Sequence, residues 1–213
     1  MAVPVTDIPT TSFRVAFPGE HGAFAEDAVA ALWATATPAP RQFPADVLRS
    51  VASGDADAGV LPVENTVAGG VVAAYDALAA APGVHVIAET ILAIEQCLLA
   101  VPGAMLEEVS VVESHPIALL QCAEFLSRFP RLRLHAASST ATAAHDVAAP
   151  GDRARAAIAG RRAARRFGLA ILAEHSGDRP HNQTRCLAAA RERVTHAVGT
   201  PARTSLVFAT ANR

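Results

Sequence analysis

Lysine is absent from this chain: all 18 basic residues among its 213 are arginines. Without a lysine amine the protein cannot form a Schiff base with a carbonyl substrate or with pyridoxal phosphate, and it has no Walker A lysine for a nucleotide phosphate. No GxGxxG segment occurs, and the PGEHG of Pro18–Gly22 is too weak a glycine pattern to indicate a dinucleotide site. These absences exclude several large classes of cofactor enzyme.

Metal-ligand spacing is also missing. The eight histidines form no HExxH pattern, and Cys97, Cys122 and Cys186 form no CxxC pair. We therefore predict no metal and no other cofactor, and we expect the three cysteines to be reduced thiols in the core.

Long apolar runs and a strong net charge are lacking too. Hydrophobic residues make up 51% of the chain, but no run approaches the roughly 18 residues of a membrane span, and the N-terminus has no basic start before an apolar block. The net charge of −2 argues against a nucleic-acid partner, and Arg161–Arg166 is interpreted as a solvated helix face. We expect a cytoplasmic protein that binds neither membrane nor nucleic acid.

What the chain does contain is a repeated order of short apolar strand, polar cluster and Ala/Leu-rich helix. This order predicts an α/β fold with mainly parallel sheets and flanking helices. The predicted strands are RVAF, AGVLPV, SVVE, LRLHAA, ARAAIA, LAILAE and CLAAA, and the predicted helices include 117–129, 141–149 and 161–167, the last ended by Gly168.

Polar clusters fall where predicted strands end and helices begin. Ser114 is expected to cap the helix that starts with His115-Pro116, and Ser138, Ser139 and Thr140 can cap the next one. Such junctions line the crevice of an open parallel sheet, where free N–H groups favour anions. Plain capping is the alternative for each cluster, but several of them together indicate a cleft for a small carboxylate.

Six segments, in order, resemble the motifs of prephenate and arogenate dehydratases. They are VAFPGEHGAFAEDA, GVLPVENTVAGGV, ESHPIALLQCAEFL, SSTATAAHDVA, AAIAGRRAARRFGLAILAE and NQTRC, which together span roughly residues 13–190. The resemblance implies two α/β lobes similar to a type II periplasmic binding protein, with the active site in the cleft between them. It also implies a small-molecule substrate, no cofactor and a homodimer.

The same resemblance suggests a division of the chain. Residues 1–11 would be a tail, 12–91 with 182–200 the first lobe, and 92–181 the second. Residues 201–213 resemble the first strand of the regulatory ACT-type domain that usually follows in the family, so that domain is expected to be missing or truncated.

The resemblance assigns catalysis to Thr184 and Arg185. Conversion of prephenate to phenylpyruvate expels carbon dioxide and water and creates an aromatic ring, so the enzyme has to hold two carboxylates and assist hydroxide departure. A guanidinium fits a carboxylate through two hydrogen bonds, which makes Arg185 the expected clamp. Thr184 would donate a hydrogen bond to the departing oxygen. Glu64 is the alternative proton source, and plain capping of its own turn is the competing interpretation.

Further residues match the motifs as substrate-binding candidates. They are Gly22, Ala23, Phe24, Asn65, Thr66, Ser114, His115, Ser139, Thr140 and Asn182. Five positions depart from the family pattern through loss of a usual group: Ala25, Gly70, Gln96, Ile117 and Cys186.

Three functions remain open from the sequence. The first is a dehydratase of prephenate or arogenate. The second is a relative that decarboxylates prephenate without aromatising it, although such proteins tend to lose the Thr-Arg pair that is kept here. The third is a binding module without catalysis, which the lost polar groups permit.

Overall fold

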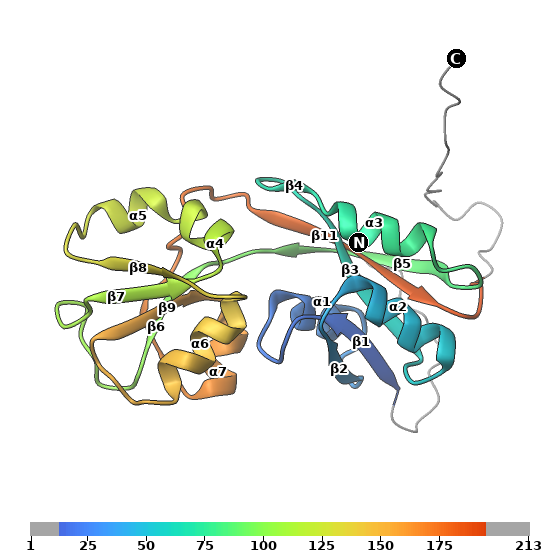
Figure 1. Ribbon diagram of the computed structural model, residues 1–213, viewed down its shortest axis with the longest axis horizontal. Helices are drawn as coiled ribbons and strands as arrows, with labels where there is room; N and C mark the ends of the chain where they lie inside the picture. The colour runs from blue at the N-terminus through green and yellow to red at the C-terminus, as the bar shows by residue number, and fades with distance from the viewer. Residues whose placement is uncertain (1–12, 195–213) are drawn as a thin grey trace, which may run out of the picture.

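The computed structural model describes residues 13–194, which form two lobes side by side (Figure 1). The predicted tail and the predicted ACT-like strand lie outside the described residues. The first lobe contains β1 (Arg14–Pro18), α1 (Phe24–Leu32), β2 (Thr37–Arg41), α2 (Pro44–Ser53), β3 (Ala58–Asn65), β4 (Gly69–Gly70), α3 (Val72–Ala79), β5 (His85–Ala93) and β11 (Gln183–Ala190). The second lobe contains β6 (Cys97–Ala100), β7 (Val111–Ser114), α4 (Pro116–Gln121), α5 (Ala123–Ser127), β8 (Arg133–Ala136), α6 (Thr140–Ala148), β9 (Arg155–Ala159), α7 (Arg161–Phe167) and β10 (Ala170–Ala173).

Each lobe is built on its own sheet. The first sheet has the order β2-β1-β3-β11-β5, with β4 beside β3, and the second has the order β10-β6-β9-β7-β8. The pairs that βαβ units connect are parallel, but β11 is antiparallel to β3 and β5, and β6 is antiparallel to β9 and β10. The predicted α/β class is confirmed, whereas the sheets are mixed rather than mainly parallel.

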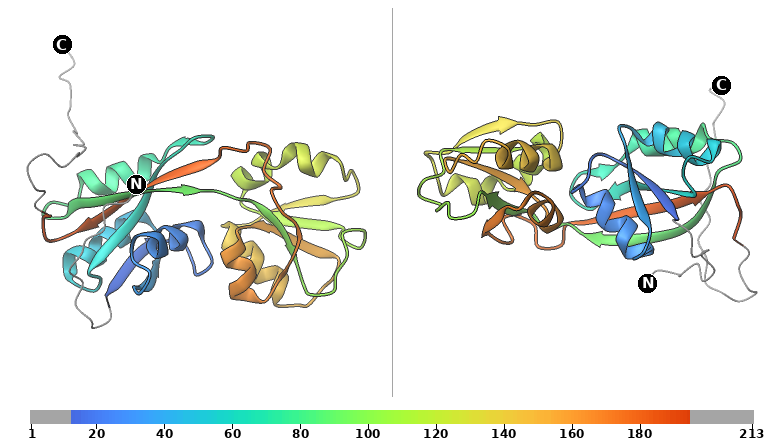
Figure 2. Two further views of the ribbon diagram at one scale, coloured as in Figure 1. Left: turned by 180° about the vertical axis from the view of Figure 1, so that it is seen from behind. Right: turned by 90° about the horizontal axis from the view of Figure 1, so that it is seen from below.

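Two chain segments connect the lobes, and they lie next to each other. Figure 2 shows β5 and β11 running together towards the second lobe, and the backbone pairing continues past the strand ends. Ile94 N donates to Asn182 O at 2.8 Å, and Ser176 N donates to Gln96 O at 2.8 Å. The sequence-based lobe boundaries, at residues 91/92 and 181/182, lie beside these connections.

Strand β11 separates two apolar layers of the first lobe. Cys186 and Ala188 pack with α1 on one face, while Leu187 and Ala189 pack with α2 and α3 on the other. This alternation is the normal consequence of the two-residue period of a strand. It also decides which side chains of β11 can reach the second lobe, because α1 lies on the side of that lobe (Figure 1).

Several helix ends follow the sequence, and two differ from it. Gly168 ends α7 with φ 67°, and Ser139 caps α6 by accepting a hydrogen bond from Thr142 N, both as predicted. Ser114 is not the cap of α4: it is the last residue of β7, its hydroxyl donates to Ile158 O at 2.6 Å, and His115 takes the cap position. The single helix predicted over 117–129 is instead divided at Cys122 into α4 and α5.

Membrane-spanning length is not reached by any helix within residues 13–194.

Candidate active site

A cavity of about 300 Å³ lies between the lobes. The first lobe contributes Phe24, Ala25, Pro62, Asn65, Ala68, Leu92, Thr184 and Cys186, the connection contributes Ile94 and Gln96, and the second lobe contributes His115, Ile117, Ala118, Gln121, Ser139 and Thr140. Its walls are mainly apolar with a few polar groups, the usual composition of a site for a small organic molecule.

Thr184 is held in this cavity by Asn65. Asn65 Nδ2 donates to Thr184 Oγ1 at 2.9 Å, and Asn65 Oδ1 accepts from Val67 N at 2.9 Å and Ala68 N at 2.8 Å. Because backbone N–H groups can only donate, they fix the orientation of the Asn65 amide. Thr184 therefore accepts from Asn65, and its own proton remains available to donate into the cavity.

Further amides continue from Asn65 towards the second lobe. Asn65 Nδ2 also donates to Asn182 Oδ1 at 2.7 Å, and Asn182 Nδ2 donates to Gln121 Oε1 at 3.1 Å. Gln96 Nε2 approaches the same Gln121 oxygen at 3.4 Å. This row of four amides joins β3, both lobe connections and α4, and three of its members line the cavity.

Arg185 lies on the opposite face of β11 from Thr184. Its Nε and Nη2 bind Glu89 Oε2 of β5 at 2.9 and 2.8 Å, and it is not a wall residue of the cavity. Thr184 and Cys186 face the cavity, so the residue between them has to point away from it. This geometry places the Arg185 guanidinium outside the cavity wall and in contact with Glu89.

Glu64 is exposed and also lies outside the cavity wall. A regular strand would place Glu64 on the same face as Pro62, which does line the cavity. However, the β3–β11 register shifts between the pairs Arg185–Glu64 and Cys186–Pro62. The shift turns Glu64 away and brings Asn65 to the cavity in its place, which is a common effect of a β-bulge.

The second lobe contributes two helix starts. Ser139 and Thr140 begin α6 at the cavity wall, and His115 caps α4, its Nδ1 accepting from Ile117 N at 3.2 Å. Because α6 begins at the cavity, the positive end of its dipole faces any anion bound there.

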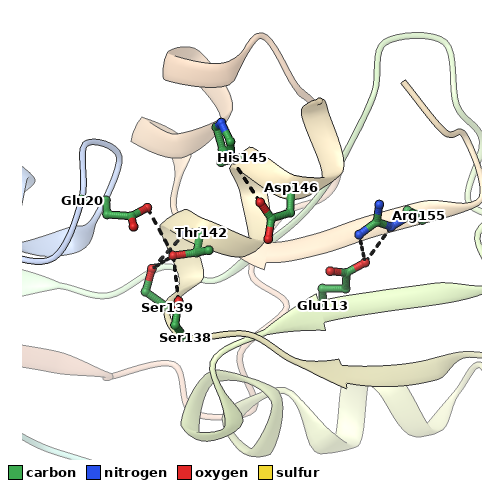
Figure 3. A network of polar contacts seen from close by, with 8 residues as sticks. All are labelled: Glu20, Glu113, Ser138, Ser139, Thr142, His145, Asp146 and Arg155. Atoms are coloured by element: carbon green, nitrogen blue, oxygen red, sulfur yellow. Dashed lines mark hydrogen bonds and ion pairs between the residues drawn. The ribbon is translucent and has the colours of Figure 1, made fainter. Parts of the chain in front are cut away.

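Side chains also join the lobes directly beside the cavity. Thr142 of α6 donates to Glu20 Oε2 of the first lobe at 3.2 Å, and Ser138 and Ser139 surround the same hydroxyl (Figure 3). Arg162 of α7 binds Asp27 of α1 at 2.5 Å. These contacts connect α6 to the loop before α1, and α7 to α1 itself.

Some of the substrate-binding candidates lie near the cavity without lining it. Thr66 Oγ1 donates to His181 O at 3.0 Å and accepts from Gln183 N at 2.9 Å, so it ties the lobe connection to β3. Gly22 N donates to the buried Glu26 carboxylate at 2.7 Å, and Ala23 caps α1. Phe24, Asn65, His115, Ser139 and Thr140 do line the wall, whereas Ser114 and Asn182 are buried next to it.

Gln121, Leu92, Ile94 and Ala118 are wall residues that the sequence analysis did not single out. Gln121 could have been identified from the sequence, because it lies four residues after Ile117 and hence on the same helix face. Leu92 and Ile94 belong to an apolar strand and its extension, and nothing in their residue types distinguishes them from core.

Burial controls the chemistry of the Cys186 thiol in the wall. Removal from water raises its pKa to about 12, and it raises the pKa of Cys122 to about 12 as well. Burial likewise raises the pKa of Cys97. A thiol with such a pKa is a poor nucleophile, so Cys186 acts as an apolar wall group.

Glu95, Glu174 and His175 bring three potential metal ligands together on the surface of the second lobe. Arg161 donates to both carboxylates, at 2.8 Å to Glu95 and 2.9 Å to Glu174, and these hydrogen bonds lower the pKa of both groups. The guanidinium already supplies the positive charge that a metal would bring, which accounts for the cluster as an ion-pair network.

Comparison with known proteins decides the family. The family model described as prephenate dehydratase matches residues 15–194. The chain belongs to the prephenate dehydratase family. An arogenate dehydratase/prephenate dehydratase of Arabidopsis thaliana is 38% identical over 204 residues, covering 95% of this chain and 51% of that protein. The chain thus spans about half the length of the curated relatives it matches.

Two solved structures are similar to this chain over most of its length. The prephenate dehydratase of Arthrobacter aurescens, solved in complex with L-Phe, superposes with a TM-score of 0.79 and 33% identity, covering 90% of this chain and 63% of that one. A protein described as a novel type of quorum quenching acylase gives a TM-score of 0.78 at 31% identity, covering 85% and 65%.

The departures from the prephenate dehydratase pattern concentrate in the cavity. Ala25, Gln96, Ile117 and Cys186 all line the wall, whereas Gly70 lies in β4 outside it. Of these positions, Ala25 and Ile117 place apolar side chains in the wall.

Proposed function

We propose that this chain is the catalytic part of a dehydratase that converts prephenate to phenylpyruvate, or arogenate to phenylalanine. Family membership, the fold and the cavity between the lobes support this function. The chain retains Thr184 and Asn65 in the wall, although several other polar positions have changed.

The observation that carries the proposal is the hydrogen bond from Asn65 to Thr184. In the proposed reaction the bond between the ring and its carboxylate breaks, carbon dioxide leaves, and the electron pair moves through the ring to expel the hydroxyl, which takes up a proton from solvent and leaves as water. Negative charge builds on the departing oxygen. A threonine that already accepts from Asn65 directs its own proton to that oxygen, and accepting one hydrogen bond strengthens the other.

Arg185 takes a positioning role in this proposal instead of the direct clamp that the sequence suggests. Its bond to Glu89 holds β11 against β5 at the residue next to Thr184. The substrate carboxylates would then be bound by helix N-termini, including that of α6, and by His115.

A non-aromatising prephenate decarboxylase is the second candidate function. The losses at Ala25 and Ile117 favour it, because a cavity with fewer polar groups assists hydroxide departure less. The retained Thr184 favours the dehydratase. A binding module without catalysis is the third alternative.

One assay separates these functions. The protein is incubated with prephenate and, separately, with arogenate, and the products are identified by mass spectrometry and ultraviolet absorbance. Phenylpyruvate or phenylalanine supports the dehydratase, a non-aromatic dihydro keto acid supports the decarboxylase, and two unchanged substrates leave the binding module. Homodimer formation and a cytoplasmic location remain predictions, the first of which light scattering tests.

A further inference from the structure

Strand β5 (His85–Ala93) forms one edge of the first sheet. Among residues 13–194 it pairs with β11 alone, and no described strand lies on its other side (Figure 2). Backbone N–H and C=O groups of a strand point alternately to its two sides, so about half of those in β5 face away from β11. Such an edge can accept a further strand, whose backbone would pair with these groups.

The edge also exposes apolar side chains. Val86 is 46% exposed and Ile91 is 55% exposed. These two residues lie opposite Ala189 and Arg185 of β11, which share one face of that strand, so both side chains project to the same side of the sheet. A strand added to β5 would therefore bury apolar surface in addition to pairing backbone groups.

The chain leaves the described part of the structure beside this edge. Ala190, the last residue of β11, pairs with His85, the first residue of β5. Three residues later Arg193 still lies there, with its Nε 3.4 Å from His85 Nε2. Residues 195–213 continue from this point. They start at the end of β5 from which a strand parallel to β5 would have to run.

Residues 204–209, TSLVFA, form a run of strand-forming residue types. The run contains β-branched and aromatic residues and neither glycine nor proline, whereas Gly199 and Pro201 in the residues before it are typical of a loop. Leu206 and Phe208 are two positions apart, so in a strand both would face the same side. The run therefore supplies an apolar strand face that fits an exposed apolar edge.

The length of the intervening segment allows the run to reach β5. Nine residues, 195–203, separate the run from Val194. Fully extended, they span about 30 Å, whereas the free side of β5 lies only about 10 Å from β11, roughly two strand spacings away. A segment tethered this closely has an effective concentration of about a millimolar or more, so it competes well against a second molecule.

We propose that residues 204–209 add to the free edge of β5 as a parallel strand and place Leu206 and Phe208 against Val86 and Ile91. The first sheet would then extend by one strand beyond β5. This docking is independent of the chemistry in the cavity. The alternatives are that the run pairs with a second copy of the chain, or within an ACT-type domain away from β5.

Disulfide trapping in the full chain tests the contact. Ile91→Cys is combined in turn with Leu206→Cys, Phe208→Cys and Val207→Cys, and the protein is oxidised at low concentration. We expect a disulfide within one chain for position 206 or 208, formed at least about tenfold faster than for Val207→Cys, whose side chain would face the opposite side of the strand. The three native cysteines are buried and do not compete.

Hydrogen exchange of the β5 amides gives an independent readout. In the wild type the amides that face away from β11 should be protected, and Leu206→Asp combined with Phe208→Asp should speed their exchange at least about tenfold. Amides bonded to β11 should change less than about threefold in the same variant, which shows that the sheet is kept. Val198→Asp is the matched control, because it adds a charge in the connecting segment, outside the proposed strand, and should leave the β5 amides unchanged.

Several results would overturn the proposal. A disulfide that links two chains and increases with protein concentration would assign the run to a second copy. Equal trapping rates at positions 206, 207 and 208 would show that no ordered contact forms. Unprotected outward amides in the wild type would show that the edge stays free, and protection that survives the double substitution would assign the edge to another occupant. Conversion of prephenate or arogenate, which the product assay measures, is not affected by any of these results.

Discussion

At the residue scale, the direction of the Thr184 hydroxyl proton connects the structure with the proposed chemistry. Asn65 donates to Thr184 and is itself oriented by two backbone N–H groups, so the Thr184 hydroxyl is left to donate into the cavity. Side-chain type alone does not specify this direction, because a hydroxyl both donates and accepts.

Asn65→Asp tests this direction. The carboxylate still accepts from Val67 N and Ala68 N but no longer donates to Thr184, which would turn its proton to the new acceptor. We expect kcat to fall about 100-fold, as for loss of one transition-state donor. In a double mutant with Thr184→Val the two losses should not add, because both remove the same hydrogen bond. Additive losses would show that Asn65 acts independently of Thr184.

The three buried thiols predict a dependence of stability on alkaline pH. Their folded-state pKa values are raised above the ordinary thiol value of 9.0, to about 12 for Cys122 and Cys186. Between these values the folded chain binds more protons than the unfolded chain, so the free energy of unfolding decreases as pH rises. The stabilisation is complete below about pH 9 and is lost towards pH 12.

Urea unfolding between pH 8 and 10.5 measures this decrease. The chain has no lysine, which leaves few other groups to titrate in the same window. Cys186→Ala should give a shallower decrease than the wild type. An identical decrease in both proteins would contradict the assigned role of Cys186.

At the scale of the element, strand β11 carries both the cavity and the core. Its alternation places Thr184 in the cavity and Arg185 against Glu89 on the other face. The ion pair is partly exposed, with about a quarter to a third of each side chain accessible, so its contribution to stability should be small.

Arg185→Lys distinguishes a structural pair from a substrate clamp. If Arg185 only holds β11 to β5, KM should stay within about threefold of the wild type, since lysine keeps the charge. A double-mutant cycle of Arg185→Met with Glu89→Leu should give a coupling energy of about 0.5–1 kcal/mol in urea unfolding. An increase in KM of tenfold or more in Arg185→Lys would instead support the clamp.

The elements also show which features of the fold and of the site could be predicted from the sequence. Regular strands, glycine stops and the Ser139 cap follow from local chemistry. Thr184, Asn65 and His115, which the motifs single out, line the cavity. The sequence analysis assigned Glu64 and Arg185 to the site without knowledge of the register shift in β3. No residue type in that strand indicates this shift.

The division of the long predicted helix at Cys122 has a distant cause. Asp178 accepts hydrogen bonds from Glu124 N at 3.0 Å and Phe125 N at 3.2 Å, and so caps a new helix from 54 and 53 residues away. Local propensity over 117–129 favours one helix, and a tertiary contact overrides it.

At the scale of the whole molecule, we expect the distance between the lobes to determine the size of the cavity. Gly22 of the first lobe, with φ +94°, meets α7 so closely that an added Cβ would lie 3.2 Å from Ala163 Cα and 3.2 Å from Phe167 Cε2. A methyl group there would have to move backbone, not only a flexible side chain.

Gly22→Ala should therefore separate the lobes. We expect a higher KM, a larger radius of gyration in solution scattering and a loss of about 1–3 kcal/mol in stability. Gly103→Ala is the matched control, because its φ of +82° gives similar backbone strain while nothing lies within 4 Å of the added carbon. Equal effects of both substitutions on KM would show that the lobe contact does not set the cavity.

The central claim is that the Thr184 hydroxyl assists departure of the substrate hydroxyl. The most direct measurement is single-turnover kinetics of Thr184→Val, with Thr184→Ser as the control that keeps the hydroxyl. We predict that valine lowers the rate of aromatic product formation about 10²- to 10³-fold, with substrate affinity little changed, and that serine retains most of the rate. A Thr184→Val protein that forms the aromatic product at the wild-type rate would contradict the account.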